Sequence, residues 1–146
     1  MLLNSAGLEI RYLKGDAYQL VFRLIGMVGS IGCEVDDEFV QQDVVRILNK
    51  AKSGRLRSHR DYKEIKTIET PKLYELRFSF ASTCGNLRCR LFFNVDHSAG
   101  LMTLIDWHIK DPTSTPDEQR EKQNEAALQA SILYERKVVE DGTSKK

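Results

Sequence analysis

The 146-residue chain has no long hydrophobic run. Its most apolar stretch, from Leu20 to Ile31, is interrupted by Arg23 and by glycines, so it falls short of the roughly 20 apolar residues that a membrane span requires. The first residues, Met1 to Ser5, lack the basic start and the sustained apolar segment of a secretory signal. These absences predict a chain that does not cross a membrane, and the cytoplasm is the expected location.

Cysteine is scarce, with Cys33, Cys84 and Cys89 as the three examples. An odd number cannot pair completely, and Cys84 and Cys89 have no second pair of Cys or His at the spacing of a zinc site. A glycine-rich phosphate loop is also absent. The sequence therefore predicts three free, mostly packed thiols, no metal site and no cofactor.

The net charge is only +1, but the charges are segregated along the chain. Residues 44–90 hold twelve Lys and Arg against four Asp and Glu, a surplus of +8, which leaves ten against seventeen, or −7, elsewhere. A run of charge is most often a solvated surface, although it can also bind a polyanion. Both interpretations stay open until the pattern of the strands is considered.

Periodicity predicts one strand and two helices in the first third of the chain. Leu8, Ile10 and Tyr12 alternate with polar residues, as in a half-buried strand. The first helix is expected to be capped by Asp16, and the second by Asp36 or Asp37. Apolar stripes at helical spacing comprise Ala17, Leu20, Val21, Leu24, Ile25 and Val28 in the first helix and Val40, Val44, Ile47, Leu48 and Ala51 in the second.

Three alternating strands are predicted after a basic loop over 55–61 and an edge segment over 62–66. Trp107 is expected in the core, whereas the place of Phe92 is left undecided. The residues expected on the core face are Tyr74, Leu76, Phe78 and Phe80, then Leu87, Cys89, Leu91 and Phe93, then Leu101, Thr103, Ile105, Trp107 and Ile109.

A last helix is predicted to begin at Thr115-Pro116-Asp117-Glu118, a capping box with proline at the first helical position. We expect it to reach about Lys137. Its apolar face is thin for a core helix, which favours docking on a partner surface.

The order of elements predicts an α+β fold, with an antiparallel-rich sheet of four to five strands, two N-terminal helices packed on one face, and a C-terminal helix. We expect one domain over residues 1–138 and a disordered tail over 139–146. Because the helices are expected on one face, the opposite face of the sheet is predicted to be open.

Charged residues gather on this predicted open face. Clustered cations repel one another unless an anion lies between them, and phosphate is the natural candidate. RNA cleavage by its own 2′-OH needs a base, cations at the phosphate and a proton donor, and the face supplies each type. Its residues are Glu75, Arg77, Arg88, Arg90, Asp106, His108 and Lys110.

Each of these residues also has a simpler interpretation, which is favoured when the residue is taken singly. Glu75 can pair across strands with Arg88 or Arg90, and His108 can be an ordinary exposed histidine. The neighbouring basic segment carries either solvating charges or contacts to the RNA backbone. Its residues are Arg55, Arg57, Arg60, Lys63 and Lys66.

The stretch from Gly54 to about Arg136 resembles the RelE/HigB superfamily of bacterial and phage toxins. Tyr74-Glu75-Leu76-Arg77-Phe78 is similar to the family's "W/Y-E-L-R" strand, and Cys89-Arg90-Leu91-Phe92-Phe93 to "Y-R-hydrophobic-hydrophobic-Y/F". Leu104-Ile105-Asp106-Trp107-His108-Ile109-Lys110, followed by Thr115-Pro116, is similar to "L-L-H-G-F-x-K-K-x-x-x-T-P". Residues 1–50 resemble the family only in the order of their predicted strand and helices.

The resemblance, nearest to the phage-derived HigB-like branch, implies a RelE-like fold and a ribosome-dependent, metal-independent mRNA endonuclease with a cognate antitoxin as protein partner. It implies that Arg77 and Arg90 hold RNA phosphate and that Lys63 or Lys66 is available to the 2′-OH. No membrane contact and no direct DNA contact are expected. The expected catalytic residues are Arg77, Arg90, His108, Lys66 and Lys110, and the expected RNA-binding residues are Lys63, Arg88, Arg55, Arg57 and Arg60.

Three positions depart from the family pattern. Asp106 stands where the family often has His, His108 where it often has Phe, and Asp111 in place of the second Lys. Carboxylates that point into the site would weaken phosphate binding. The alternative is therefore a catalytically degenerate RelE-fold protein that binds RNA, the ribosome or a protein partner without cleavage.

Overall fold

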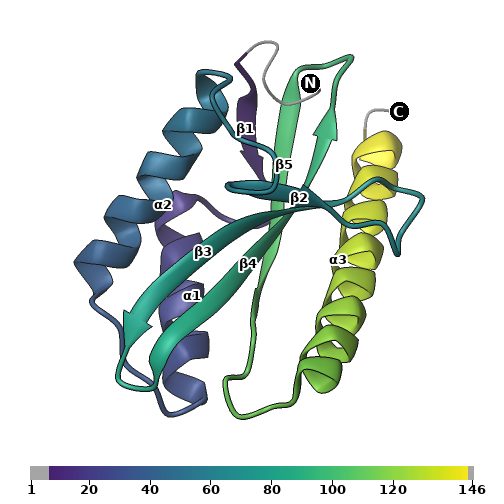
Figure 1. The fold of residues 1–146 in the computed structure, drawn as a ribbon. Helices are drawn as coiled ribbons and strands as arrows, with labels where there is room; N and C mark the ends of the chain where they lie inside the picture. Colours follow the sequence, from purple (N-terminus) through teal and green to yellow (C-terminus); the bar gives the residue numbers. More distant parts are fainter. Residues whose placement is uncertain (1–6, 145–146) are drawn as a thin grey trace.

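The computed structural model describes residues 7–144 (Figure 1). The predicted fold class is confirmed, and the sheet has five strands. In chain order the elements are β1 (Glu9–Tyr12), α1 (Ala17–Ser30), α2 (Asp37–Lys52), β2 (Tyr62–Glu64), β3 (Tyr74–Ser82), β4 (Gly85–Asp96), β5 (Leu101–Ile109) and α3 (Pro116–Ser144).

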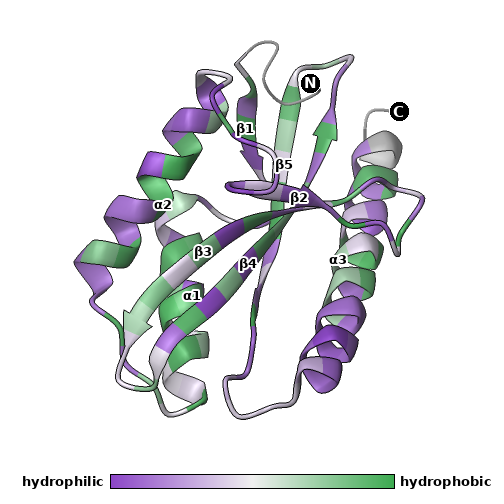
Figure 2. Ribbon diagram, viewed as in Figure 1, coloured by the Kyte–Doolittle hydropathy of each residue, from purple (hydrophilic) through white to green (hydrophobic). Residues whose placement is uncertain are grey.

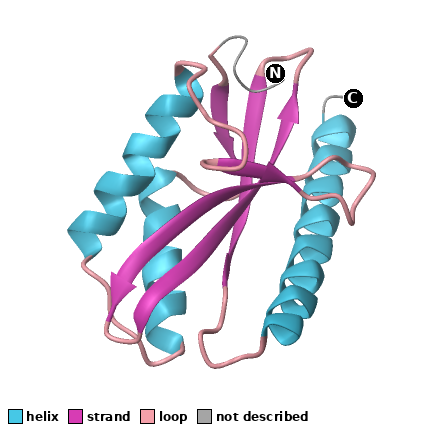
Figure 3. Ribbon diagram, in the orientation of Figure 1, coloured by secondary structure: helices cyan, strands magenta, loops and turns pink. Residues whose placement is uncertain are grey.

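The sheet has the strand order β1-β5-β4-β3-β2 (Figure 3). Strands β2 to β5 pair antiparallel with their neighbours, whereas β1 runs parallel to β5. The long hairpins of β3, β4 and β5 bring side chains from three successive strands into direct cross-strand register. This register builds the candidate site.

Helices α1 and α2 cover one face of the sheet, as predicted. Asp16 accepts a hydrogen bond from the Gln19 backbone N–H at 2.9 Å, and Asp36 accepts one from that of Phe39 at 3.0 Å, so both predicted N-caps are confirmed. The buried helix residues are Leu20, Val21, Leu24 and Val28 of α1 and Val40, Val44, Ile47, Leu48 and Ala51 of α2.

Helix α3 lies across the other face of the sheet (Figure 1), so the prediction of an open second face is wrong where the helix packs. Ala127 and Ala130 are almost fully buried there against Phe92 and Ile105. The small alanine side chains let the helix approach closely, and the thin apolar stripe thus packs on the chain's own sheet. The predicted role of this stripe in partner docking does not hold for these alanines.

The helix is also longer than predicted. It continues past Lys137 to Ser144, so the predicted disordered tail over 139–146 is helical as far as the structure describes it. Residues 145–146 lie outside the described residues.

A β-bulge changes the face assignment within β5. Phe92 pairs with Asp106, but its neighbour Phe93 pairs with Leu104, which leaves Ile105 as the extra residue. Ile105 therefore packs under α3, opposite to the prediction, whereas Leu104 lies in the core beneath α1 and α2. Strict alternation could not reveal this extra residue. Beyond the bulge, Trp107 lies in the predicted core, and Phe92 is buried under α3.

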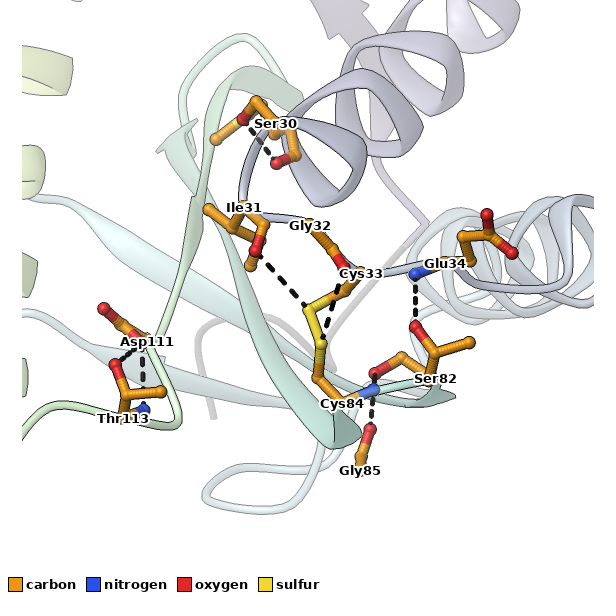
Figure 4. Close-up of a disulfide and its surroundings, with 12 residues drawn as sticks. Ser30, Ile31, Gly32, Cys33, Glu34, Ser82, Cys84, Gly85, Asp111 and Thr113 are labelled. Carbon is orange, nitrogen blue, oxygen red and sulfur yellow. Dashed lines mark hydrogen bonds between the residues drawn. A yellow bond between two sulfur atoms is a disulfide. The ribbon is translucent and has the colours of Figure 1, made fainter.

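Cys33 and Cys84 form a disulfide (Figure 4), so the prediction of three free thiols is wrong. The turn between α1 and α2 meets the β3–β4 turn, where the backbone N–H of Thr83 donates to the carbonyl of Glu34 at 3.0 Å. The sequence separation of 51 residues hid this proximity. Cys89 is the free, buried thiol of the described chain.

Candidate nucleic-acid interface

Three predicted site residues lie side by side across the sheet. Arg77 of β3 is directly opposite Arg90 of β4, which is in turn opposite His108 of β5. In the next row, Arg88 lies opposite Ser79, and its carbonyl accepts a hydrogen bond from the Lys110 backbone N–H at 2.9 Å. We call this cluster the basic patch, and its residues are Arg77, Arg88, Arg90, His108 and Lys110. Figure 2 shows the alternation of hydrophilic and hydrophobic residues along β3 and β4 that produces it.

Arg90 is the buried centre of the patch, with only 4% of its surface exposed. Its Nη1 donates to the carbonyls of Cys89 at 3.1 Å and Phe78 at 3.4 Å. Its Nε lies 3.6 Å from Oε2 of Glu75, which confirms one of the two cross-strand partners considered for that carboxylate. Burial lowers the pKa of Arg90, and the Glu75 charge opposes that shift.

Arg77 connects the patch to the basic loop. Its Nη1 donates to the carbonyl of His59 at 3.1 Å, and its backbone N–H donates to the carbonyl of Asp61 at 2.9 Å. The side chain stays half-buried, whereas Arg88 is exposed. The patch therefore has a fixed cation at its centre and more accessible cations on either side.

His108 is a half-buried histidine whose ring lies over Phe92, with centroids 6.5 Å apart. Its Nε2 is buried and has no hydrogen-bond partner among the described residues. Burial, and then the charges of Lys110, Arg90 and Lys122, lower the pKa of His108 to about 4. The imidazole is therefore neutral at pH 7 and can accept a proton.

Lys110 occupies the end of the patch, just beyond β5. Burial, and then the positive charge of Arg90, lower the pKa of Lys110. A lysine with a lowered pKa loses its proton more readily than an exposed one. Lys110 is therefore the group of the patch best suited to donate a proton.

The carboxylates of Asp106 and Asp111 both have partners outside the basic patch. Asp106 lies opposite Phe92, on the same face as His108 as predicted, but its carboxylate pairs with Arg23 of α1. Asp111 accepts hydrogen bonds from the backbone N–H of Thr113 at 2.9 Å and from its hydroxyl at 2.7 Å. The charge of Asp106 is thus compensated by Arg23, whereas Asp111 is held by hydrogen bonds from a neutral residue.

The other predicted catalytic and RNA-binding residues belong to β2, to the chain just after it and to the basic loop, which Arg77 contacts through the His59 carbonyl. Lys63 pairs in register with Glu75 and is exposed, whereas Lys66 follows the end of β2 and is not in the sheet. The exposed side chain of Arg55 donates to the Ser53 hydroxyl at 2.7 Å. The other two predicted residues of the basic loop, Arg57 and Arg60, are also exposed.

Sequence reasoning missed one member of the site, Gln123 of α3. Its Nε2 donates a short hydrogen bond to Oε2 of Glu75. Gln123 stands four residues before Ala127 and seven before Ala130, so helical spacing puts all three on one face. That spacing was the available signal, but it has meaning only once α3 is known to pack on the sheet.

Among residues 7–144, no group of three or more His, Cys, Asp or Glu side chains is placed to hold a metal ion. In the same part of the chain, no helix has the length and apolar character of a membrane span. No protein-family model matches the chain, and comparisons with curated proteins and with solved structures find no match.

Proposed function

We propose that this chain is a toxin-like endoribonuclease that cleaves mRNA by attack of the RNA's own 2′-OH, without a metal ion. The observation that carries the proposal is the cross-strand row of Arg77, Arg90 and His108, with Lys110 beside it. This row combines fixed cations with a neutral imidazole and a lysine of lowered pKa. Those are the group types that the reaction requires.

In the proposed reaction, Arg77, Arg88 and Arg90 hold the non-bridging oxygens of the scissile phosphate. His108 takes the proton of the 2′-OH as its oxygen attacks phosphorus, and Lys110 gives a proton to the departing 5′ oxygen. The products are a 2′,3′-cyclic phosphate and a 5′-hydroxyl. The phosphate's negative charge would raise the pKa of His108 as it binds, which strengthens the base where it is needed.

The same proposal includes cleavage on the ribosome, a cognate antitoxin and a cytoplasmic location. These three parts rest on the resemblance to RelE/HigB toxins. Disulfides are rare in the cytoplasm of most organisms. In that compartment we therefore expect Cys33 and Cys84 as two thiols.

Expression in a bacterial host with RNA sequencing tests the proposal. We expect growth arrest and new 5′-hydroxyl ends in mRNA, both abolished by Arg77→Ala. The matched control is Arg46→Ala, which removes an exposed arginine of α2 that pairs with Asp43; it should remain toxic. Harmless wild-type expression with intact mRNA would refute the proposed cleavage.

RNA binding without cleavage is the second candidate, and the enclosed Nε2 of His108 favours it. A histidine with a pKa of about 4 is a weak base unless the bound phosphate raises that value. Salt-sensitive RNA binding, with unchanged RNA after prolonged incubation on ribosomes, would select this function.

A further inference from the structure

Helix α3 reaches the basic patch through the side chain of Gln123. The same carboxylate oxygen of Glu75 that accepts its hydrogen bond lies 3.6 Å from Nε of Arg90. The side chains of Arg90 and Glu75 are only 5% and 8% exposed. One buried oxygen therefore faces two N–H donors, one from a neutral amide and one from a cation.

The two donors differ in whether they form a hydrogen bond with this oxygen. The amide of Gln123 has its hydrogen bond, whereas Nε of Arg90 is buried without a partner in the described part of the chain. A carboxylate normally forms a short charge-assisted hydrogen bond with a buried guanidinium, because an unpaired N–H there is costly. Gln123 thus holds Glu75 short of Arg90, and the guanidinium keeps a charge that is only partly compensated.

We propose that Glu75 and Gln123 are positioning residues that set the anion affinity of Arg90. Glu75 competes with the RNA phosphate for the guanidinium, and Gln123 restrains that competition. The inference rests on the proposed function, since it assumes that the ligand is an RNA phosphate. Helix α3 then influences the anion affinity of the basic patch, although neither residue is required to touch the RNA.

Substitutions at the two positions should act in opposite directions. Glu75→Gln removes the competing charge and keeps the shape, so RNA binding should tighten, on the order of three- to tenfold. Gln123→Ala lets the carboxylate close on Nε of Arg90, so binding should weaken by a similar factor. The double variant should bind like Glu75→Gln, because no carboxylate remains to be restrained.

Gln119→Ala is the matched control. Gln119 lies one turn earlier on the same helix, and its Nε2 donates to the carbonyl of Asp111 at 2.7 Å, away from Glu75. This variant loses an equivalent side-chain hydrogen bond of α3 and should bind RNA as the wild type does.

The test measures affinity for a short single-stranded RNA at low salt by fluorescence anisotropy, with thermal melts to verify that each variant folds. The same series is measured with inorganic pyrophosphate, followed through the NMR signal of the Arg90 Nε–H. Weaker binding by both single variants indicates a merely structural role and overturns the inference, as does equal affinity throughout. If Glu75→Gln does not fold, the inference is tested by comparing the RNA affinity of Gln123→Ala with that of Gln119→Ala: weaker binding by Gln123→Ala alone supports it, and equal affinity overturns it.

The two ligands separate this inference from the proposed function. If pyrophosphate shows the expected order and RNA does not bind, the proposed function fails and the positioning roles stand. If RNA binds without that order, the positioning roles fail. Binding of neither ligand overturns both.

Discussion

Arg23 of α1 and Asp106 of β5 form a two-pronged ion pair, with Nε to Oδ1 at 2.6 Å and Nη2 to Oδ2 at 2.8 Å. In the ladder with β4, Asp106 lies opposite Phe92 and His108 lies opposite Arg90, so both residues occupy the same face of β5. The hydrogen bonds to Asp106 also raise the pKa of Arg23. The pair thus keeps a carboxylate close to the patch but bound to its own cation.

Asp106→Asn should tighten RNA binding. The substitution frees the charge of Arg23, whose side chain is 57% exposed, and adds one cation near the phosphate path. We expect a severalfold gain at low salt and a salt dependence steeper by about one ion. Titrations at several salt concentrations measure both quantities. Asp43→Asn, which frees Arg46 on α2, is the control and should leave affinity unchanged.

His108 should make the protein less stable in weak acid. Its pKa of about 4 in the folded state lies below the ordinary histidine value of 6.5, so the unfolded chain binds the proton more tightly between these values. Stability from this group is complete above pH 6.5, falls as the pH drops toward 4, and loses at most about 3 kcal/mol.

Urea unfolding at several pH values measures that loss, and His108→Gln should flatten it. An NMR titration gives a direct check, because the His108 ring signals should not shift between pH 7 and pH 5. A midpoint near 6.5 would contradict the burial-induced shift.

Arg90→Ala should destabilise the fold by about 3–5 kcal/mol, because it leaves the carboxylate of Glu75 buried and without its cation. The double variant Arg90→Met with Glu75→Leu should recover much of this loss while RNA binding stays weak. Denaturant unfolding and anisotropy separate the two effects. Recovery of RNA binding in the double variant would argue against Arg90 as a phosphate ligand.

Reduction of the Cys33–Cys84 disulfide should lower the free energy of unfolding. For a sequence separation of 51 residues, the loop-entropy estimate is about 4 kcal/mol. Unfolding with and without dithiothreitol measures the change, and a Cys33→Ser, Cys84→Ser variant should not respond. Cys89 should stay unmodified by iodoacetamide at pH 8, since burial raises its pKa to about 12.

The sequence predicted the elements whose signals are local. The helix caps at Asp16 and Asp36 and the alternation in β3 and β4 depend on neighbouring residues, so they were correct without knowledge of the fold. The same alternation placed Arg77 and Arg90 on one face of neighbouring strands, and the structure adds that they lie directly opposite each other.

Contacts between distant segments could not be predicted in this way. The Cys33–Cys84 bond and the Gln123 contact to Glu75 depend on where α1 and α3 pack against the sheet. The core positions of Met102 and Leu104 depended on a single extra residue, which no periodic pattern can anticipate.

The extra residue at the bulge also decides which face of the sheet each later residue of β5 occupies. Before the bulge, even-numbered Met102 and Leu104 face α1 and α2, and after it odd-numbered Trp107 does. Deleting Ile105 would make Leu104 and Asp106 neighbours opposite Phe93 and Phe92, so Leu104 and Trp107 would both keep the core face. The sheet can thus lose the extra residue without exchanging the core and the candidate site, and the deletion costs the packing of the Ile105 side chain under α3.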